Sequence, residues 1–138
     1  RGSVCSPLIP EGQADYLVAM ELLEGLRALS MLKPDGKAIV DVRTIMPITV
    51  ASGQRQYPEG LEERLRERGL VIEATAEATR LGEPRAANSV LLGVLSCFLP
   101  LAEEAWRQAF EGGFKPKALE VNWQAFLLGR TLAVARGK

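Results

Sequence analysis

The spacing of apolar positions changes from one segment to the next in the first third of the chain. Residues 16–20 form a short continuous apolar run typical of a strand, and residues 21–29 carry leucines at helical spacing. Residues 33–36 contain Pro-Asp-Gly, which ends a helix and favours a tight turn. Residues 38–42 are again mostly apolar and β-branched. The pattern therefore predicts strand, helix, turn and strand.

The alternation continues further along the chain. A proline interrupts the β-branched stretch 43–53, which indicates a loop or a short edge strand. Residues 59–68 predict a helix with a narrow apolar stripe, in which the charged run 62–68 faces solvent. A strand at 70–74 and a short helix at 76–81 follow. This order indicates an α/β fold: a mostly parallel sheet with helices on both faces.

The remaining sequence is helical. Residues 90–99 are apolar around nearly the whole circumference of a helix, which indicates burial on most sides. Two more helices are predicted at 101–110 and 116–135, separated by Gly112-Gly113. The fold therefore has a helical C-terminal part, and residues 1–138 are expected to form one domain.

Composition excludes several classes of function. Seventeen basic and seventeen acidic residues cancel, so no net charge favours nucleic acid or an anionic membrane. No apolar run approaches the roughly 18 residues of a membrane span, and no hydrophobic leader precedes residue 16. We expect a cytoplasmic protein that binds neither nucleic acid nor membrane.

The side chains available for catalysis are few. The chain has no histidine, which removes the general base of Ser-His-Asp and Cys-His arrangements. Its two cysteines, Cys5 and Cys97, are too few for an iron–sulfur cluster, which takes about four cysteine ligands, or for a classical zinc site. We expect no catalytic residue and no metal ligand, with Cys97 packed in its helix as a small buried hydrophobic residue.

Two polar residues are candidates for cofactor binding. Glu11 lies in a Pro-Glu-Gly loop that either presents its carboxylate to a ligand or is simply a turn with Gly12 at positive φ, and the turn is favoured. Asn88 begins the apolar helix, where it is either a structural cap or a contact to a bound molecule. Glu21 and Glu24 are interpreted as stabilising the start of their helix.

Several segments also carry a family resemblance. They are SPLIPEGQADYLVAMELLEGLR near the start, Pro-Ile-Thr-Val after the second strand, AANSVLLGVL, and VNWQAFLLGR near the end. Together they resemble the gamma subunits of 2-oxoacid:ferredoxin oxidoreductases, and within that group the beta subunits of indolepyruvate oxidoreductases. The resemblance runs from Ser6 to about Arg130.

The resemblance implies a function carried out with partners. Such complexes oxidatively decarboxylate a 2-oxoacid to an acyl-CoA and pass the electrons to ferredoxin. Thiamine diphosphate and the iron–sulfur clusters are expected on a larger catalytic subunit, with none bound by this chain alone. An arylpyruvate such as indolepyruvate is the leading substrate, and the chain alone is expected to be inactive.

One departure from the family pattern leaves alternatives open. Members of the family begin with a strand and a glycine-rich turn that opens a helix, and this first βα unit is not found before Ser6. An uncovered sheet edge favours association, so the isolated chain is expected to form a homodimer. The alternatives are a free-standing nucleotide- or CoA-binding module without redox activity, or a purely structural role.

Overall fold

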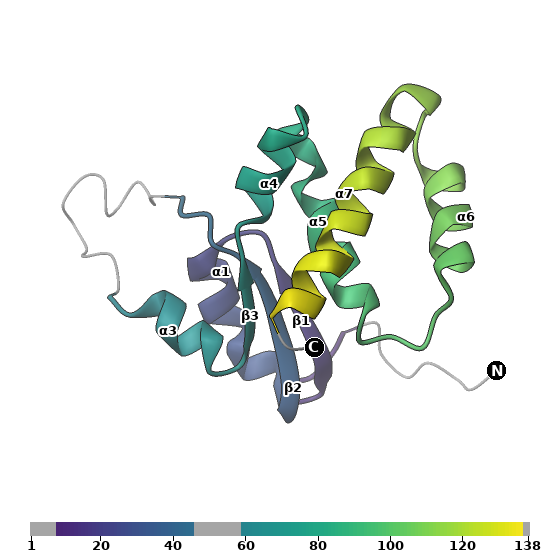
Figure 1. Cartoon of the computed structure of the whole chain (residues 1–138). Helices are drawn as coiled ribbons and strands as arrows, with labels where there is room; N and C mark the ends of the chain where they lie inside the picture. The colour runs from purple at the N-terminus through teal and green to yellow at the C-terminus, as the bar shows by residue number, and fades with distance from the viewer. Residues whose placement is uncertain (1–7, 46–58, 137–138) are drawn as a thin grey trace.

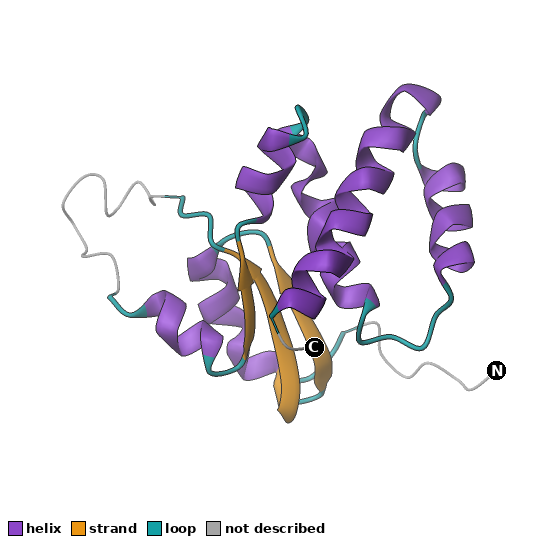
Figure 2. Cartoon of the chain, viewed as in Figure 1, coloured by secondary structure: helices purple, strands orange, loops and turns teal. Residues whose placement is uncertain are grey.

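A parallel sheet forms the centre of the molecule. The computed structural model describes residues 8–45 and 59–136. Its three strands, β1 (Ala14–Ala19), β2 (Leu32–Asp41) and β3 (Gly69–Ile72), lie side by side in the order β1-β2-β3, and both neighbouring pairs are parallel. Helices cover both faces of the sheet (Figures 1 and 2). The α/β class predicted from the alternation of strands and helices is confirmed.

Helices α1 (Leu22–Arg27) and α3 (Leu61–Arg66) cover one face. Leu22 and Leu65 are buried there against Val40 and Val71 of the sheet. A Cβ on Gly25 would lie 3.0 Å from Val40 Cγ1, so α1 approaches the strand closely. The narrow apolar stripe predicted for the helix at residues 59–68 is thus the surface through which α3 packs on the sheet.

The opposite face carries α4 (Ala74–Arg80), α5 (Ala87–Ser96) and α7 (Pro116–Ala135). One hydrophobic core joins the sheet to these helices, and its larger members are Ile39, Ile72, Val90, Leu91 and Val94. Helix α6 (Glu103–Gly113) packs on α7 away from the sheet (Figure 1). The helical C-terminal part is therefore confirmed, with α5 as its link to the sheet. No helix among the described residues has the length and apolar character needed to cross a bilayer.

The turn predicted at 33–36 is wrong. Helix α1 ends at Arg27, a 3₁₀ turn follows over Ala28–Met31, and β2 already begins at Leu32. Between the pairs Ala14–Leu32 and Tyr16–Lys37, β2 advances five positions while β1 advances two. The Pro-Asp-Gly residues form a bulge in the strand instead, because a bulge tolerates a proline and the extra residues.

A charge pair joins the two strands at this bulge. Lys33 Nζ lies 2.6 Å from Asp15 Oδ1, and both side chains are accessible to solvent. The hydrogen bond from the ammonium to the Asp15 carboxylate, and the charge of that carboxylate, raise the pKa of Lys33 above its usual value. Of the stretch 43–53 predicted as a loop or edge strand, residues 46–53 lie outside the described residues, as does Cys5.

Candidate functional site

The carboxyl ends of the strands are where open α/β sheets usually bind ligands. Two buried carboxylates lie there, and both have structural partners. Asp41, fully buried at the end of β2, accepts hydrogen bonds from Thr75 N at 3.2 and 3.3 Å and from the Thr75 hydroxyl. Glu21 accepts from Glu24 N at 3.0 Å and from Ile45 N at 3.2 Å. They anchor the first turns of α4 and α1, so the interpretation of Glu21 as a helix-start residue is confirmed.

The two candidates Glu11 and Asn88 lie at the surface. Glu11 Oε1 accepts a hydrogen bond from Ser30 Oγ at 3.4 Å, and the adjacent Gly12 has φ +69° and donates its N–H to Ser30 O at 2.9 Å. The expected turn at Gly12 is confirmed. Asn88 is exposed, and its Oδ1 accepts from Ser89 N at 2.9 Å. Glu11 and Asn88 each form a hydrogen bond with a different neighbouring residue, and the described structure does not place the two in one site. Ligand binding by either residue stays a prediction.

A different asparagine, Asn122, was interpreted from the sequence as lining a polar edge of its helix, and this interpretation is wrong. Asn122 of α7 is 6% exposed, accepts a hydrogen bond from Ser89 Oγ at 2.7 Å and donates to Ala118 O at 2.9 Å. Its amide is therefore satisfied by protein groups and fixes α5 against α7. The sequence does contain a signal for the burial of Asn122: it lies four residues before Phe126, which places both residues on one face of a helix.

Cys97 also belongs to the α5–α7 contact. Its sulfur is partly buried and lies 3.7 Å from Gly93 O and 3.8 Å from Arg130 O. A thiol between two carbonyl oxygens acts as a weak donor, in agreement with the packing role expected for it. The described residues contain no group of three or more histidine, cysteine, aspartate or glutamate side chains arranged to hold a metal ion.

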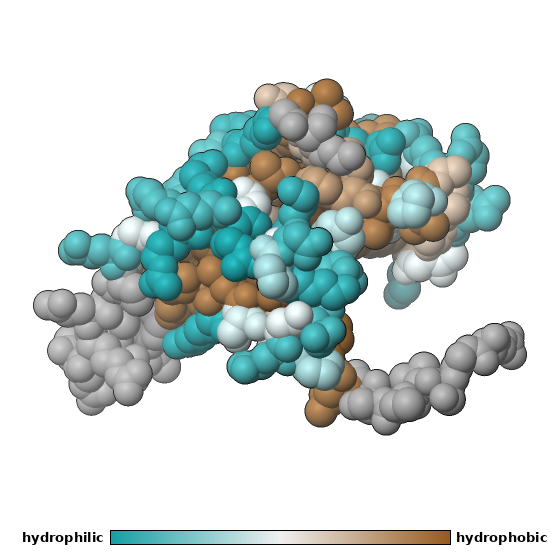
Figure 3. Space-filling model, turned by 90° about the horizontal axis from the view of Figure 1, so that it is seen from below, coloured by the Kyte–Doolittle hydropathy of each residue, from teal (hydrophilic) through white to brown (hydrophobic). Residues whose placement is uncertain are grey.

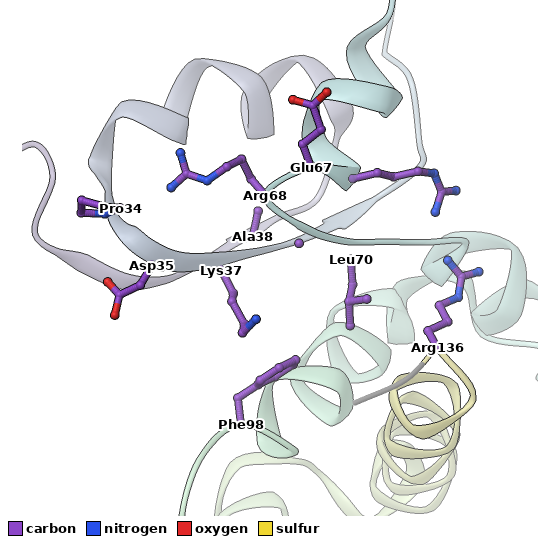
Figure 4. A pocket seen from close by; sticks show the side chains of 12 residues that line it. Pro34, Asp35, Lys37, Ala38, Glu67, Arg68, Leu70, Phe98 and Arg136 are labelled. Carbon is purple, nitrogen blue, oxygen red and sulfur yellow. The ribbon is translucent and has the colours of Figure 1, made fainter.

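A hollow of about 650 Å³ lies at the other end of the sheet, where β2 and β3 begin. Lys37 and Leu70 point from the strands toward Phe98 at the end of α5, while Arg68 and Glu67 lie on the other side of the strands (Figure 4). Its lining residues are Pro34, Asp35, Gly36, Lys37, Ala38, Arg66, Glu67, Arg68, Gly69, Leu70, Phe98 and Arg136. We call this the basic hollow. The face seen in Figure 3, from below the view of Figure 1, mixes hydrophilic and apolar residues.

Three cations of the basic hollow, Lys37, Arg68 and Arg136, form no ion pair with any described residue. Arg68 donates from Nη2 to Lys33 O at 2.8 Å, and Arg136 donates to the carbonyl of Val71. Lys37 Nζ lies 5.9 Å from the centre of the Phe98 ring. The sequence did not predict this grouping, because the charged run 62–68 was interpreted only as a solvated face and its partners lie far along the chain.

The family model described as pyruvate ferredoxin/flavodoxin oxidoreductase matches residues 2–132. The chain belongs to this family. The resemblance inferred from separated sequence segments is thereby confirmed, and it extends over both the sheet and the helical part.

The similar proteins within the pyruvate ferredoxin/flavodoxin oxidoreductase family are subunits of one kind. The chain is 31% identical over 97% of its length to indolepyruvate oxidoreductase subunit IorB of Archaeoglobus fulgidus, covering 70% of that protein. It is 32% identical over 91% of its length to the subunits of the same name from Thermococcus kodakarensis and Pyrococcus horikoshii, covering 66% of each. The chain thus spans about two thirds of the length of these relatives.

A solved structure supports the fold of this family member. The gamma subunit of a keto/oxoacid ferredoxin oxidoreductase from Geobacter sulfurreducens superimposes with a TM-score of 0.66 at 22% identity, covering 90% of this chain and 66% of that one. At this identity the likeness establishes the architecture alone. The described geometry offers charge recognition at the basic hollow.

Proposed function

We propose that the chain is a subunit of a thiamine-diphosphate-dependent 2-oxoacid:ferredoxin oxidoreductase. The complex would oxidatively decarboxylate indolepyruvate or a related arylpyruvate to an acyl-CoA. The observation that carries this proposal is the identity of 31–32% with indolepyruvate oxidoreductase subunits over at least 91% of the chain. Family membership supports the oxidoreductase, and the names of these relatives support the substrate.

The chemistry of the reaction requires groups beyond this chain. Thiamine diphosphate supplies the carbanion stabilisation in such decarboxylations, and iron–sulfur clusters carry electrons. The described residues include one cysteine, Cys97, whose sulfur faces two backbone carbonyls, so they do not fit a cluster. We therefore assign both cofactors to a larger catalytic partner subunit in the cytoplasm, with ferredoxin as the electron acceptor of the complex.

The contribution of this chain is structural support of that partner. Its buried polar groups, Glu21, Asp41 and Asn122, hydrogen-bond to the backbone or side chains of neighbouring elements. Buried groups that are already satisfied in this way stabilise one arrangement of the fold. The surface groups then remain for contact with the catalytic subunit.

Co-expression with the large, cysteine-rich, thiamine-binding subunit that the proposal requires tests it. We expect turnover of indolepyruvate with CoA and a viologen dye only when both chains are present, and none with the purified chain alone. Pyruvate and 2-oxoglutarate serve as competing substrates that test the arylpyruvate preference. Turnover by the isolated chain would contradict the subunit role. Binding of ATP or CoA by the isolated chain, with no effect on the partner's turnover, would favour a free-standing binding module instead.

A further inference from the structure

The basic hollow concentrates positive charge on a chain whose net charge is zero. Several arginines elsewhere, among them Arg27, Arg80 and Arg107, are paired with a carboxylate on their own helix. In the basic hollow, Lys37, Arg68 and Arg136 have no such partner among the described residues, although Asp35 and Glu67 also line it. Three unpaired cations around one depression create a local attraction for carboxylates or phosphates.

Two of these cations are held in place before any ligand binds. The guanidinium of Arg68 is fixed by its bond to Lys33 O at 2.8 Å, and that of Arg136 by its bond to Val71 O. Each guanidinium has five N–H donors, so donors remain for another molecule. A side chain that is already ordered loses less conformational entropy on binding, which favours recognition by these groups.

The distribution of the cations argues against a single phosphate as the ligand. Lys37 lies beside Phe98 on one side of the strands, whereas Arg68 lies on the other side (Figure 4). An extended peptide with several carboxylates can place one carboxylate beside each of these separated cations. A compact anion such as phosphate cannot contact all of them at once.

The lining of the basic hollow beside Lys37 is partly apolar. Leu70 and the Phe98 ring line it, and Phe98 is also 6.0 Å, between ring centres, from Tyr16 of β1. An apolar side chain of a bound segment would be buried against these groups while its acidic neighbours pair with the cations. Interfaces commonly combine an apolar contact with a charged rim in this way.

We propose that the basic hollow docks an acidic segment of a partner protein, with an apolar side chain of that segment resting on Leu70 and Phe98. This proposal goes beyond the subunit role, since it assigns a surface and the charge of its occupant. The segment is bound through side chains and does not add a strand to the sheet. An added strand would need to pair with β3, where the carbonyl of Val71 already accepts a hydrogen bond from Arg136.

The test uses the 138-residue chain, labelled for NMR, and a synthetic peptide in which glutamates flank a phenylalanine. We expect amide shifts confined to the residues that line the basic hollow, and an affinity that falls as salt is raised. The same peptide with glutamines in place of glutamates should bind at least about tenfold more weakly. Equal binding of the two peptides, or shifts spread over the whole surface, would overturn the proposal.

Charge-reversal variants make the test site-specific. Lys37→Glu changes an exposed side chain, and Lys117→Glu makes the same charge change on α7. We expect Lys37→Glu to lower the affinity for the acidic peptide by about tenfold or more, and Lys117→Glu to leave it nearly unchanged. An equal loss in both variants would mean that only the overall charge is sensed. Inorganic pyrophosphate that binds at the hollow more tightly than the peptide would assign the site to a phosphate ligand and overturn the proposal.

Discussion

Helix α7 is joined to its two neighbouring helices in opposite ways. Against α5 it makes a close contact through glycines: a Cβ on Gly93 would lie 2.0 Å from Phe126 O, and one on Gly129 would lie 2.0 Å from Val90 O. Against α6 it makes a contact through rings, in which Phe110 lies 5.5 Å from Trp123 and 5.2 Å from Phe126 between ring centres. One contact is between backbones and the other between large side chains.

The two contacts also differ in how completely polar groups are satisfied. Across α5 and α7, Ser89 bonds to Asn122 at 2.7 Å and Arg130 bonds to Ser96 Oγ at 2.9 Å. At the α6 contact, the buried Nε1 of Trp106 has no hydrogen-bond partner among the described residues. Phe110 is the one residue of α6 that is buried. Helices α5 and α7 therefore form one closely packed unit on the sheet, to which α6 is attached by a few aromatic side chains.

The largest effect is expected from Gly93→Ala. The added methyl group would overlap a backbone carbonyl, so the two helices must separate along their whole contact, and we expect a loss of about 4 kcal/mol or more in the free energy of unfolding. Gly112→Ala on α6 is the matched control, because nothing lies within 4 Å of its Cβ position. The control should gain about 0.5–1 kcal/mol from helix propensity. Urea denaturation of both variants measures this, and a mild effect of Gly93→Ala would refute the close contact.

A smaller effect is expected from Phe110→Ala. Truncation removes the only buried side chain of α6, and we expect a loss of about 3 kcal/mol, reduced if the aromatic cluster collapses into the space. The chain's two tryptophans, Trp106 and Trp123, both lie in this cluster, so their fluorescence reports the change. Hydrogen exchange should accelerate in α6 and stay slow in α5. Equal acceleration in both helices would show that α6 is not separately attached.

The sequence predicted the alternation of strands and helices because each element's spacing of apolar residues is a local property. It did not predict which side of α5 faces the sheet, since the helix is apolar all round: Leu91 is fully buried against the sheet, while Leu92 is only partly buried, beside the aromatic cluster. The basic hollow was missed for a related reason. Lys37 and Arg136 come from β2 and the end of α7, and only tertiary folding brings them together.

The smallest effect is expected from Ser89→Ala, which tests whether hydrogen bonding adds to the glycine contact of α5 and α7. Removing the hydroxyl leaves the buried Asn122 Oδ1 without its donor, and we expect a loss of about 1–2 kcal/mol in the free energy of unfolding. Ser30→Ala is the control: its hydroxyl bonds to the exposed Glu11 at 3.4 Å, and its loss should change stability by no more than about 0.5 kcal/mol. Both variants are compared by urea denaturation. A cost for Ser89→Ala as small as that for Ser30→Ala would mean that close backbone packing alone holds α5 to α7, and that Asn122 finds another donor when Ser89 is removed.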